Sequence, residues 1–257
     1  MYYYIYHQDV RRQKFQKRLT ALERKVNSLG LQGKNIHSNS YSSVDESLKK
    51  IFSETTESTL VVVGDDELFS KTLSVLVTLS AKPTVGYIPF FKNTQISESL
   101  GISCGEDAIM TLARRRIETI YIPRINDDIF FVSHLEANCA NLSITVNKKY
   151  SVKCESDSAK IRVANMPLSV LDKKTNSNIN PCDMFLELVV IEESKRGALK
   201  RDVDAKISGF FSCEDINIQS NEQKTVIVDG FKEVQTPVRI ESSPHQIKLI
   251  VGKSRMF

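Results

Sequence analysis

The feature that most constrains the fold of this chain is a change in hydrophobic periodicity near residue 123. Before it, short apolar runs alternate with segments whose apolar residues recur every three or four positions. Residues 60–63 are apolar without alternation, which is typical of a parallel strand covered on both faces. Residues 15–29 carry an apolar stripe at helical spacing. This strand–helix order predicts a Rossmann-like, mostly parallel α/β sheet with helices on both faces.

Beyond residue 123 the helical periodicity nearly disappears. Residues 142–146 place Leu, Ile and Val at every second position, the pattern of a strand with one buried face. Asp229-Gly230, directly after an apolar run, is a strong signal for a β-hairpin turn. We therefore expect an α/β nucleotide-binding-like domain over residues 1–123, followed by an antiparallel β-sandwich, or a split barrel, over residues 124–257.

Composition excludes several classes of protein. Hydrophobic residues make up 41% of the chain and charged residues 26%, which is ordinary for a globular protein and too apolar for a disordered one. A net charge of +4 is too small to indicate a nucleic-acid-binding protein. The sequence lacks the long apolar run of a membrane span and the basic start of a signal peptide, so neither is predicted.

The cysteines and histidines favour an ordinary intracellular protein. The cysteines are five in number, widely spaced and without a C-x-x-C pair, namely Cys104, Cys139, Cys154, Cys182 and Cys213. This argues against a disulfide framework and against a zinc site, and we expect a reducing cytoplasm. None of the four histidines has a partner at metal-ligand spacing, so each is expected to be structural.

Residues 61–68 form the segment most suggestive of binding, because a buried strand there runs into a glycine and then a helix. In doubly wound sheets, ligands lie at the carboxyl ends of the strands, where helix N-termini attract phosphate. Gly64, Asp65, Asp66 and Glu67 are therefore candidates for binding a nucleotide. The alternative is helix capping, because Asp65 suits an N-cap and acidic residues in a first turn favour the helix dipole.

A second segment, residues 86–94, also leads from a strand through a loop into a helix. Asn93 and Thr94 are the candidates here for binding a cofactor, and the alternative is again a loop followed by a helix cap. The three arginines at 114–116 end a predicted helix, where cations suit the helix dipole. The alternative for them is contact with an anionic membrane surface or a nucleotide.

The order of these segments resembles that of the diacylglycerol kinase catalytic domain and its relatives, the bacterial lipid kinases and NAD kinases. Family members carry G-G-D-G-T after such a strand, then P-L-G-T-G-N-D-F-A-R-x-L-G-I, and D-G-E near the C-terminal end of a β-sandwich domain. This chain has G-D-D-E-L at 64–68, P-F-F-K-N-T-Q-I-S-E-S-L-G-I at 89–102 and V-D-G-F at 228–231. The resemblance covers almost the whole chain and implies that the last strand, near residue 249, returns to the first domain.

The first motif departs from the family pattern in its glycines. In the family, glycines let the backbone approach the triphosphate and point N–H groups at it. Only Gly64 and Asp66 are kept here, whereas Asp65 and Glu67 replace glycines and add two negative charges where phosphate would lie. These carboxylates would repel the phosphates of ATP, and a bound magnesium ion would reverse that repulsion.

The other two motifs depart further. In the second, family glycines are replaced by Phe91 and Asn93, the asparagine by Thr94 and the aspartate by Gln95. In the third, the acid that the family offers for proton removal from the substrate hydroxyl is replaced by Phe231. Phenylalanine cannot accept a proton, so no catalytic residue and no metal ligand is assigned.

The resemblance therefore implies a diverged lipid-kinase-like protein that has lost phosphoryl transfer and retains binding of a nucleotide or lipid between its domains. One alternative is an active ATP-dependent lipid or NAD kinase, a transferase with an alcohol acceptor, in which Asp66 helps to organise Mg²⁺. Another is a non-catalytic structural or interaction module. ATP and Mg²⁺ as cofactors, a lipid or dinucleotide partner and a homodimer are implied by resemblance alone, whereas peripheral membrane contact is the alternative for the arginines at 114–116.

Overall fold

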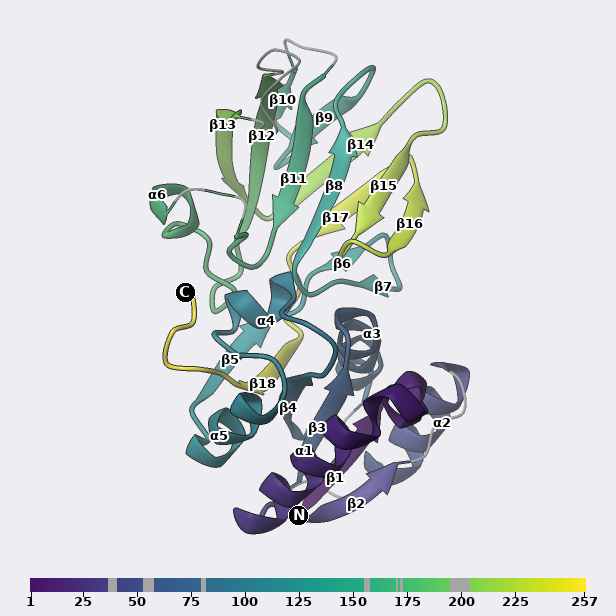
Figure 1. The fold of residues 1–257 in the computed structure, drawn as a ribbon. Helices are drawn as coiled ribbons and strands as arrows, with labels where there is room; N and C mark the ends of the chain where they lie inside the picture. Colours follow the sequence, from purple (N-terminus) through teal and green to yellow (C-terminus); the bar gives the residue numbers. More distant parts are fainter. Residues whose placement is uncertain are drawn as a thin grey trace. The chain divides into compact units, whose positions relative to one another are not determined.

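A computed structural model describes residues 1–36, 41–52, 58–79, 82–154, 158–169, 171, 173–194 and 204–257. The chain folds as two compact units (Figure 1). The first comprises residues 1–120, 168–177 and 245–257, and the second comprises residues 121–167 and 178–244. The sequence-based division at residue 123 lies close to the first crossing between the units, whereas residues 168–177 and 245–257 belong to the first unit.

The first unit contains alternating strands and helices. In chain order they are β1 (Tyr2–Tyr6), η1 (Gln8–Arg11), η2 (Gln13–Phe15), α1 (Gln16–Ser28), β2 (Gly33–Ile36), α2 (Tyr41–Phe52), β3 (Thr59–Gly64), α3 (Asp66–Val77), β4 (Thr84–Pro89), α4 (Gln95–Ser99), α5 (Glu106–Arg114), β5 (Ile117–Tyr121), α6 (Lys173–Asn176) and β18 (Gln246–Ile250). The strands form one six-stranded sheet in the order β2-β1-β3-β4-β18-β5. The pairs β1–β2, β1–β3, β3–β4 and β4–β18 are parallel, which confirms the predicted α/β class.

Burial explains why these strands hold together. The side chains of residues 60–63 in β3 are fully buried, as their uninterrupted apolar run predicted. In β4, a Cβ added at Gly86 would lie 2.2 Å from a side-chain carbon of Leu112, so glycine lets α5 pack directly against the sheet. Leu249 of β18 pairs with Val85 of β4. The C-terminal strand thus joins the sheet of the first unit, as the resemblance implied.

The second unit is built of strands. In chain order they are β6 (Arg124–Ile125), β7 (Ile129–Phe130), β8 (His134–Asn138), β9 (Ser143–Val146), β10 (Tyr150–Val152), β11 (Lys160–Ala164), β12 (Leu186–Ser194), β13 (Asp204–Cys213), β14 (Asp215–Gln219), β15 (Thr225–Val228), β16 (Lys232–Gln235) and β17 (Val238–Glu241). They form two six-stranded sheets, in the orders β10-β9-β14-β17-β6-β7 and β13-β12-β11-β8-β15-β16. Their strand pairs are antiparallel.

The two sheets of the second unit share one core. Ile144 and Val146 from the first of these sheets and Leu135, Ile161 and Leu188 from the second belong to the same buried cluster. Strands β8, β9, β11, β12 and β14 contribute every second side chain to that cluster, which is the alternation expected of a sheet with one buried face. The predicted antiparallel β-sandwich is therefore confirmed.

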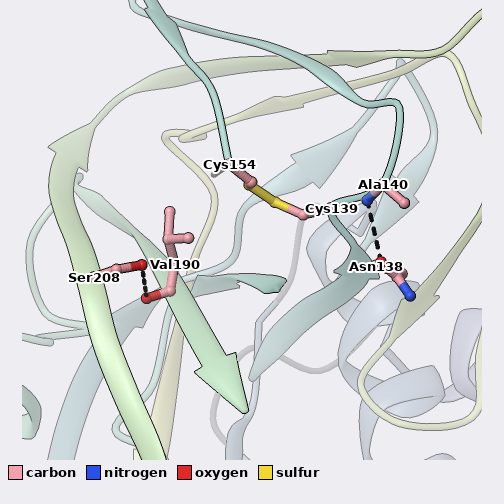
Figure 2. Close-up of a disulfide and its surroundings, with 6 residues drawn as sticks. All are labelled: Asn138, Cys139, Ala140, Cys154, Val190 and Ser208. Carbon is pink, nitrogen blue, oxygen red and sulfur yellow. Dashed lines mark hydrogen bonds between the residues drawn. A yellow bond between two sulfur atoms is a disulfide. The ribbon is translucent and has the colours of Figure 1, made fainter. Parts of the chain in front are cut away.

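Figure 2 shows a disulfide in this unit between Cys139, directly after β8, and Cys154, two residues beyond β10. Their Cα atoms are 6.1 Å apart, within the usual range of about 4.4–6.8 Å. The expectation that the cysteines form no disulfide is wrong for this pair. Their separation of 15 residues conceals the pairing, because β9 and β10 fold into an antiparallel hairpin that brings the two cysteines together.

We predict that breaking this disulfide destabilises the protein. Closing a loop of this length in the unfolded chain is worth about 3 kcal/mol, so Cys139→Ser should lower the free energy of unfolding by that order. Urea denaturation with and without dithiothreitol measures the effect. Cys182→Ser, which changes a cysteine outside the disulfide, is the control and should not alter the sensitivity to reductant. Equal stability with and without reductant would contradict the prediction.

Glu187 in β12 is an acid in a buried position, with 3% of its surface exposed. Ser212 Oγ donates to its Oε1 at 3.3 Å, whereas its Oε2 is buried and has no hydrogen-bond partner among the described residues. Burial, and to a smaller extent the nearby Asp183, raises the pKa of the Glu187 carboxyl to about 7. The folded protein therefore favours the neutral form of this side chain more strongly than the unfolded chain does.

Glu187→Gln should stabilise the protein at high pH and not at low pH. Because the folded-state pKa of Glu187 lies above its unfolded value of 4.5, the free energy of unfolding falls as pH rises between about 4.5 and 7. The neutral glutamine escapes this loss, a gain of up to roughly 3 kcal/mol at pH 8. Urea denaturation at pH 5 and pH 8 measures it, with the exposed Glu233→Gln as control. A gain that is the same at both pH values would contradict it.

Candidate functional site

Three strands of the first unit end at the same edge of its sheet. Because β1, β3 and β4 are parallel neighbours, the residues that follow them lie side by side. His7 follows β1, Asp65 follows β3, and Phe90 and Phe91 follow β4. The ring of His7 packs edge-on against Phe91 with 5.3 Å between ring centroids. The sequence-predicted segments thus meet at the carboxyl edge of the sheet.

Asp65 caps the N-terminus of α3. Its Oδ1 accepts a hydrogen bond from Leu68 N at 3.0 Å, and its Oδ2 lies 3.4 Å from His7 Nε2. The other ring nitrogen of His7, Nδ1, accepts from Asp9 N at 3.1 Å, so the neutral ring carries its proton on Nε2. A donor from His7 and a donor from the helix therefore both point at one carboxylate, and the capping interpretation of Asp65 is confirmed.

Asp66 connects three elements through its carboxylate. Tyr87 Oη in β4 donates to Oδ1 at 2.9 Å, and Thr94 Oγ1, just before α4, donates to the same oxygen at 2.6 Å. Ile96 N lies 3.4 Å from Oδ2. Burial, followed by the negative charge of Asp66, raises the pKa of the Tyr87 hydroxyl well above its ordinary value. The hydroxyl therefore stays protonated and remains a donor.

The side chains of Asn93 and Thr94 also form hydrogen bonds that stabilise local structure. Thr94 is the N-cap of α4, where its hydroxyl accepts from Ser97 N while the Ser97 hydroxyl accepts from Thr94 N. Asn93 Oδ1 accepts from Cys104 N at 2.8 Å. The capping alternative is therefore confirmed for Thr94, and Asn93 closes the loop that precedes α5.

Gly64 and Glu67 complete the predicted set. A Cβ added at Gly64 would lie 2.8 Å from the Cβ of His7, so glycine is required there by the close approach of β1. Glu67 lies in the first turn of α3 with its side chain exposed, where a negative charge favours the helix dipole. Four predicted residues from the first motif thus lie together, and Thr94 joins them through Asp66.

Arg18 is a residue of this edge that sequence reasoning missed. It reaches from α1 to the loop after β4, where Nη1 donates to Phe91 O at 3.3 Å and Nη2 contacts Cys104 Sγ at 2.7 Å. Its guanidinium lies 5.2 Å from the centroid of the Phe90 ring. His7 and Tyr87 were missed as well, because only the order of strands in the sheet, and no local motif, brings them to Asp65 and Asp66.

The arginines at 114–116 lie at the other end of the strands. Arg115 Nη1 donates to Tyr2 Oη at 3.1 Å and to Thr59 Oγ1 at 3.3 Å. Tyr2 and Thr59 are the first residues of β1 and β3. Arg115 therefore ties α5 to the amino ends of the strands, opposite to the edge that carries Asp65.

The second unit contains the third motif. Asp229 and Gly230 form the predicted turn between β15 and β16, with φ angles of 50° and 81°. The Asp229 carboxylate is buried and accepts from Ser133 N at 2.7 Å, Val132 N at 2.9 Å and His134 N at 3.2 Å. Burial lowers the pKa of the neighbouring His134 imidazole. Asp229 thus holds the start of β8, and Phe231 is 39% exposed.

The N-terminus of α3 carries groups that oppose a triphosphate. Phosphate binds such a terminus through its free N–H groups, and one of them, Leu68 N, already donates to Asp65 Oδ1. A phosphate would also meet the negative charges of Asp65, Asp66 and Glu67. Among the described residues, no three His, Cys, Asp or Glu side chains gather into a metal-binding group.

Solved structures share this fold. A diacylglycerol kinase from Bacillus anthracis str. Sterne is 15% identical, with a TM-score of 0.75 over 98% of this chain and 97% of that one. A second structure from the same organism, provisionally described as a diacylglycerol kinase, is 14% identical, with a TM-score of 0.76 over the same shares. The chain has the diacylglycerol kinase fold. No protein-family model and no curated protein matches the sequence.

The shared fold confirms the architecture that the resemblance implied, and at this identity it shows the fold alone. The match covers 98% of this chain and so extends over both units. No helix in the described ranges is long and apolar enough to cross a membrane.

We predict that Asp66→Ala destabilises the first unit. The change leaves the hydroxyls of Tyr87 and Thr94 without their shared acceptor, and an unsatisfied buried group costs about 1–3 kcal/mol. The free energy of unfolding, measured by urea denaturation, should therefore fall by roughly 2 kcal/mol. Glu67→Ala is the matched control, because this neighbouring acid is exposed; its effect should stay within about 0.5 kcal/mol. Equal losses in both variants would contradict the prediction.

Proposed function

We propose that this chain is a diverged protein of the diacylglycerol and lipid kinase fold that no longer transfers a phosphoryl group. The observation that carries the proposal is the position of the Asp65 carboxylate, which accepts the hydrogen bond from Leu68 N at the N-terminus of α3. Kinases of this kind depend on positioning the phosphates and neutralising their charge. Here the protein's own carboxylate occupies the place where a phosphate oxygen would accept that bond.

The second support is the set of hydrogen bonds that the Asp66 carboxylate accepts. In the active-kinase alternative this residue helps to organise Mg²⁺, whereas here its Oδ1 accepts from the hydroxyls of Tyr87 and Thr94. A cation that took the place of these donors on Oδ1 would leave the hydroxyl of Tyr87, which is 1% exposed, without a partner in a buried position. The carboxylate is thus engaged in holding β4 and α4 to α3.

The third support comes from the resemblance. The acid that would remove the proton from an acceptor hydroxyl is replaced by Phe231, which cannot accept a proton. In this proposal the chain therefore lacks two groups that the family uses. One is the open helix terminus that binds the phosphates of ATP, and the other is the acid that removes the proton from the acceptor hydroxyl. The protein then serves in binding or interaction rather than in catalysis.

Retained binding of a nucleotide, a lipid or a dinucleotide stays a prediction from resemblance, and the Asp65 carboxylate at the N-terminus of α3 argues against the nucleotide. Homodimerisation stays a prediction from resemblance, and peripheral membrane contact stays a prediction from the arginines at 114–116. A cytoplasmic location also stays a prediction, and the disulfide between Cys139 and Cys154 is the observation against it, because reducing compartments keep thiols reduced.

We expect no phosphoryl transfer by the purified full-length protein. The assay supplies radiolabelled ATP, Mg²⁺ and either dioleoylglycerol in phosphatidylglycerol vesicles or NAD, and measures the labelled product. A genuine diacylglycerol kinase serves as the positive control under the same conditions. Product above the level of a heat-inactivated sample would contradict the proposal and favour the active-kinase alternative.

Restoring two glycines should open the helix terminus. We predict that Asp65→Gly with Glu67→Gly gains a thermal stabilisation by MgATP that the unchanged protein lacks; a ligand at 100 times its dissociation constant stabilises by about 2.7 kcal/mol. Asp65→Asn is the matched control, because asparagine caps a helix as well as aspartate does but carries no charge. A MgATP shift in the unchanged protein would overturn the closed-terminus proposal, and a shift in Asp65→Asn would assign the effect to charge alone.

A further inference from the structure

A polar groove lies on the first unit between α1 and the strands β1 and β2. Its volume is about 170 Å³, below the range of roughly 300–1,000 Å³ that is typical of sites for drug-sized ligands. It is lined by Tyr4, Tyr6, Glu23, Asn27, Gln32 and Asn35, together with Val26 and Gly33. None of these residues belongs to the carboxyl-edge site, so the groove is separate from the proposed function.

Two tyrosines line the groove, and Tyr6 is the more exposed of them, since Tyr4 is only 2% exposed. The rings of Tyr4 and Tyr6 project from the same side of β1, with their centroids 6.2 Å apart and their planes inclined by 27°. The Tyr4 hydroxyl donates to Leu31 O at 2.7 Å, which fixes that ring. Burial, followed by the charge of Glu23, raises the pKa of Tyr6 to about 12. Both phenols therefore stay neutral at physiological pH.

The rim of the groove is polar and available for binding. Glu23 and Asn27 project from α1 and Asn35 from β2, and all three are exposed. Within the described ranges, no hydrogen bond or ion pair engages these three side chains. Gln32 Nε2 donates to Asn27 O at 3.3 Å, which holds the loop between α1 and β2 against the helix.

The chemistry of the rim selects the class of ligand. A carboxylate accepts hydrogen bonds, and each carboxamide both donates and accepts, as a hydroxyl group does. Glu23 would repel an anion, and a purely apolar ligand would cover these polar groups without replacing their bonds to water. We propose that this groove binds a small uncharged polyhydroxy compound, such as a cyclic sugar or polyol, with its carbon skeleton against the exposed part of Tyr6.

Amide chemical shifts of the ¹⁵N-labelled full-length protein test this proposal. Glucose, myo-inositol and glycerol are titrated separately, so that ring compounds are compared with a short polyol. At least one ring compound should give saturable shifts confined to residues near Glu23, Asn27 and Asn35, and glycerol should bind more weakly. A hydrogen bond to a charged group exceeds one to a neutral group by about 1 kcal/mol, so Glu23→Gln, which keeps a neutral acceptor, should raise the dissociation constant about fivefold.

Asn35→Ala should weaken binding as well, and both variants change exposed side chains, so the fold can be checked from the same spectra. Glu233→Gln, an exposed acid in the second unit, is the matched control and should leave the dissociation constant unchanged. Two results would overturn the proposal: no saturable shifts with any of the three compounds, or shifts at the groove that Glu23→Gln and Asn35→Ala leave unaltered.

Discussion

The hydrogen bonds to Asp66 hold the candidate site in place. One carboxylate oxygen accepts from Tyr87 of β4 and from Thr94 at the start of α4, although these residues are 21 and 28 positions away in the sequence. Thr94 in turn caps α4 through its exchange with Ser97. The N-terminus of α3, the middle strand β4 and the helix that follows it are therefore fixed to one another by a single acidic side chain.

Asp65 and Asp66 together determine which polar groups at the carboxyl edge of the sheet are already engaged in hydrogen bonds. In a phosphate-binding loop, glycines leave backbone N–H groups free for the ligand. Here Asp65 accepts from Leu68 N and faces the ring of His7. The two acidic side chains thus cap the helix and join the strands within a fold shared with diacylglycerol kinase structures, and the proposal is that this arrangement leaves no place for a phosphate at the helix terminus.

Much of the fold could be predicted from sequence because burial leaves a local pattern. The run at 60–63 gave the buried parallel strand, and the alternation at 142–146 gave one sheet of the sandwich. The site could be predicted only in part. Capping by Asp65 and Thr94 is local and was foreseen, whereas the contacts of His7 and Tyr87 depend on which strands are neighbours. The disulfide and the buried Glu187 were missed for the same reason, since each depends on pairing between strands.

The most direct test of the closed helix terminus is a crystal structure of the protein grown with millimolar MgATP. We predict that Asp65 Oδ1 stays within hydrogen-bond distance of Leu68 N and that Asp66 keeps its bonds to Tyr87 and Thr94, with no triphosphate at the N-terminus of α3. A triphosphate bound there, with the Asp65 side chain rotated away and Mg²⁺ on Asp66, would contradict the proposal and identify a working kinase site.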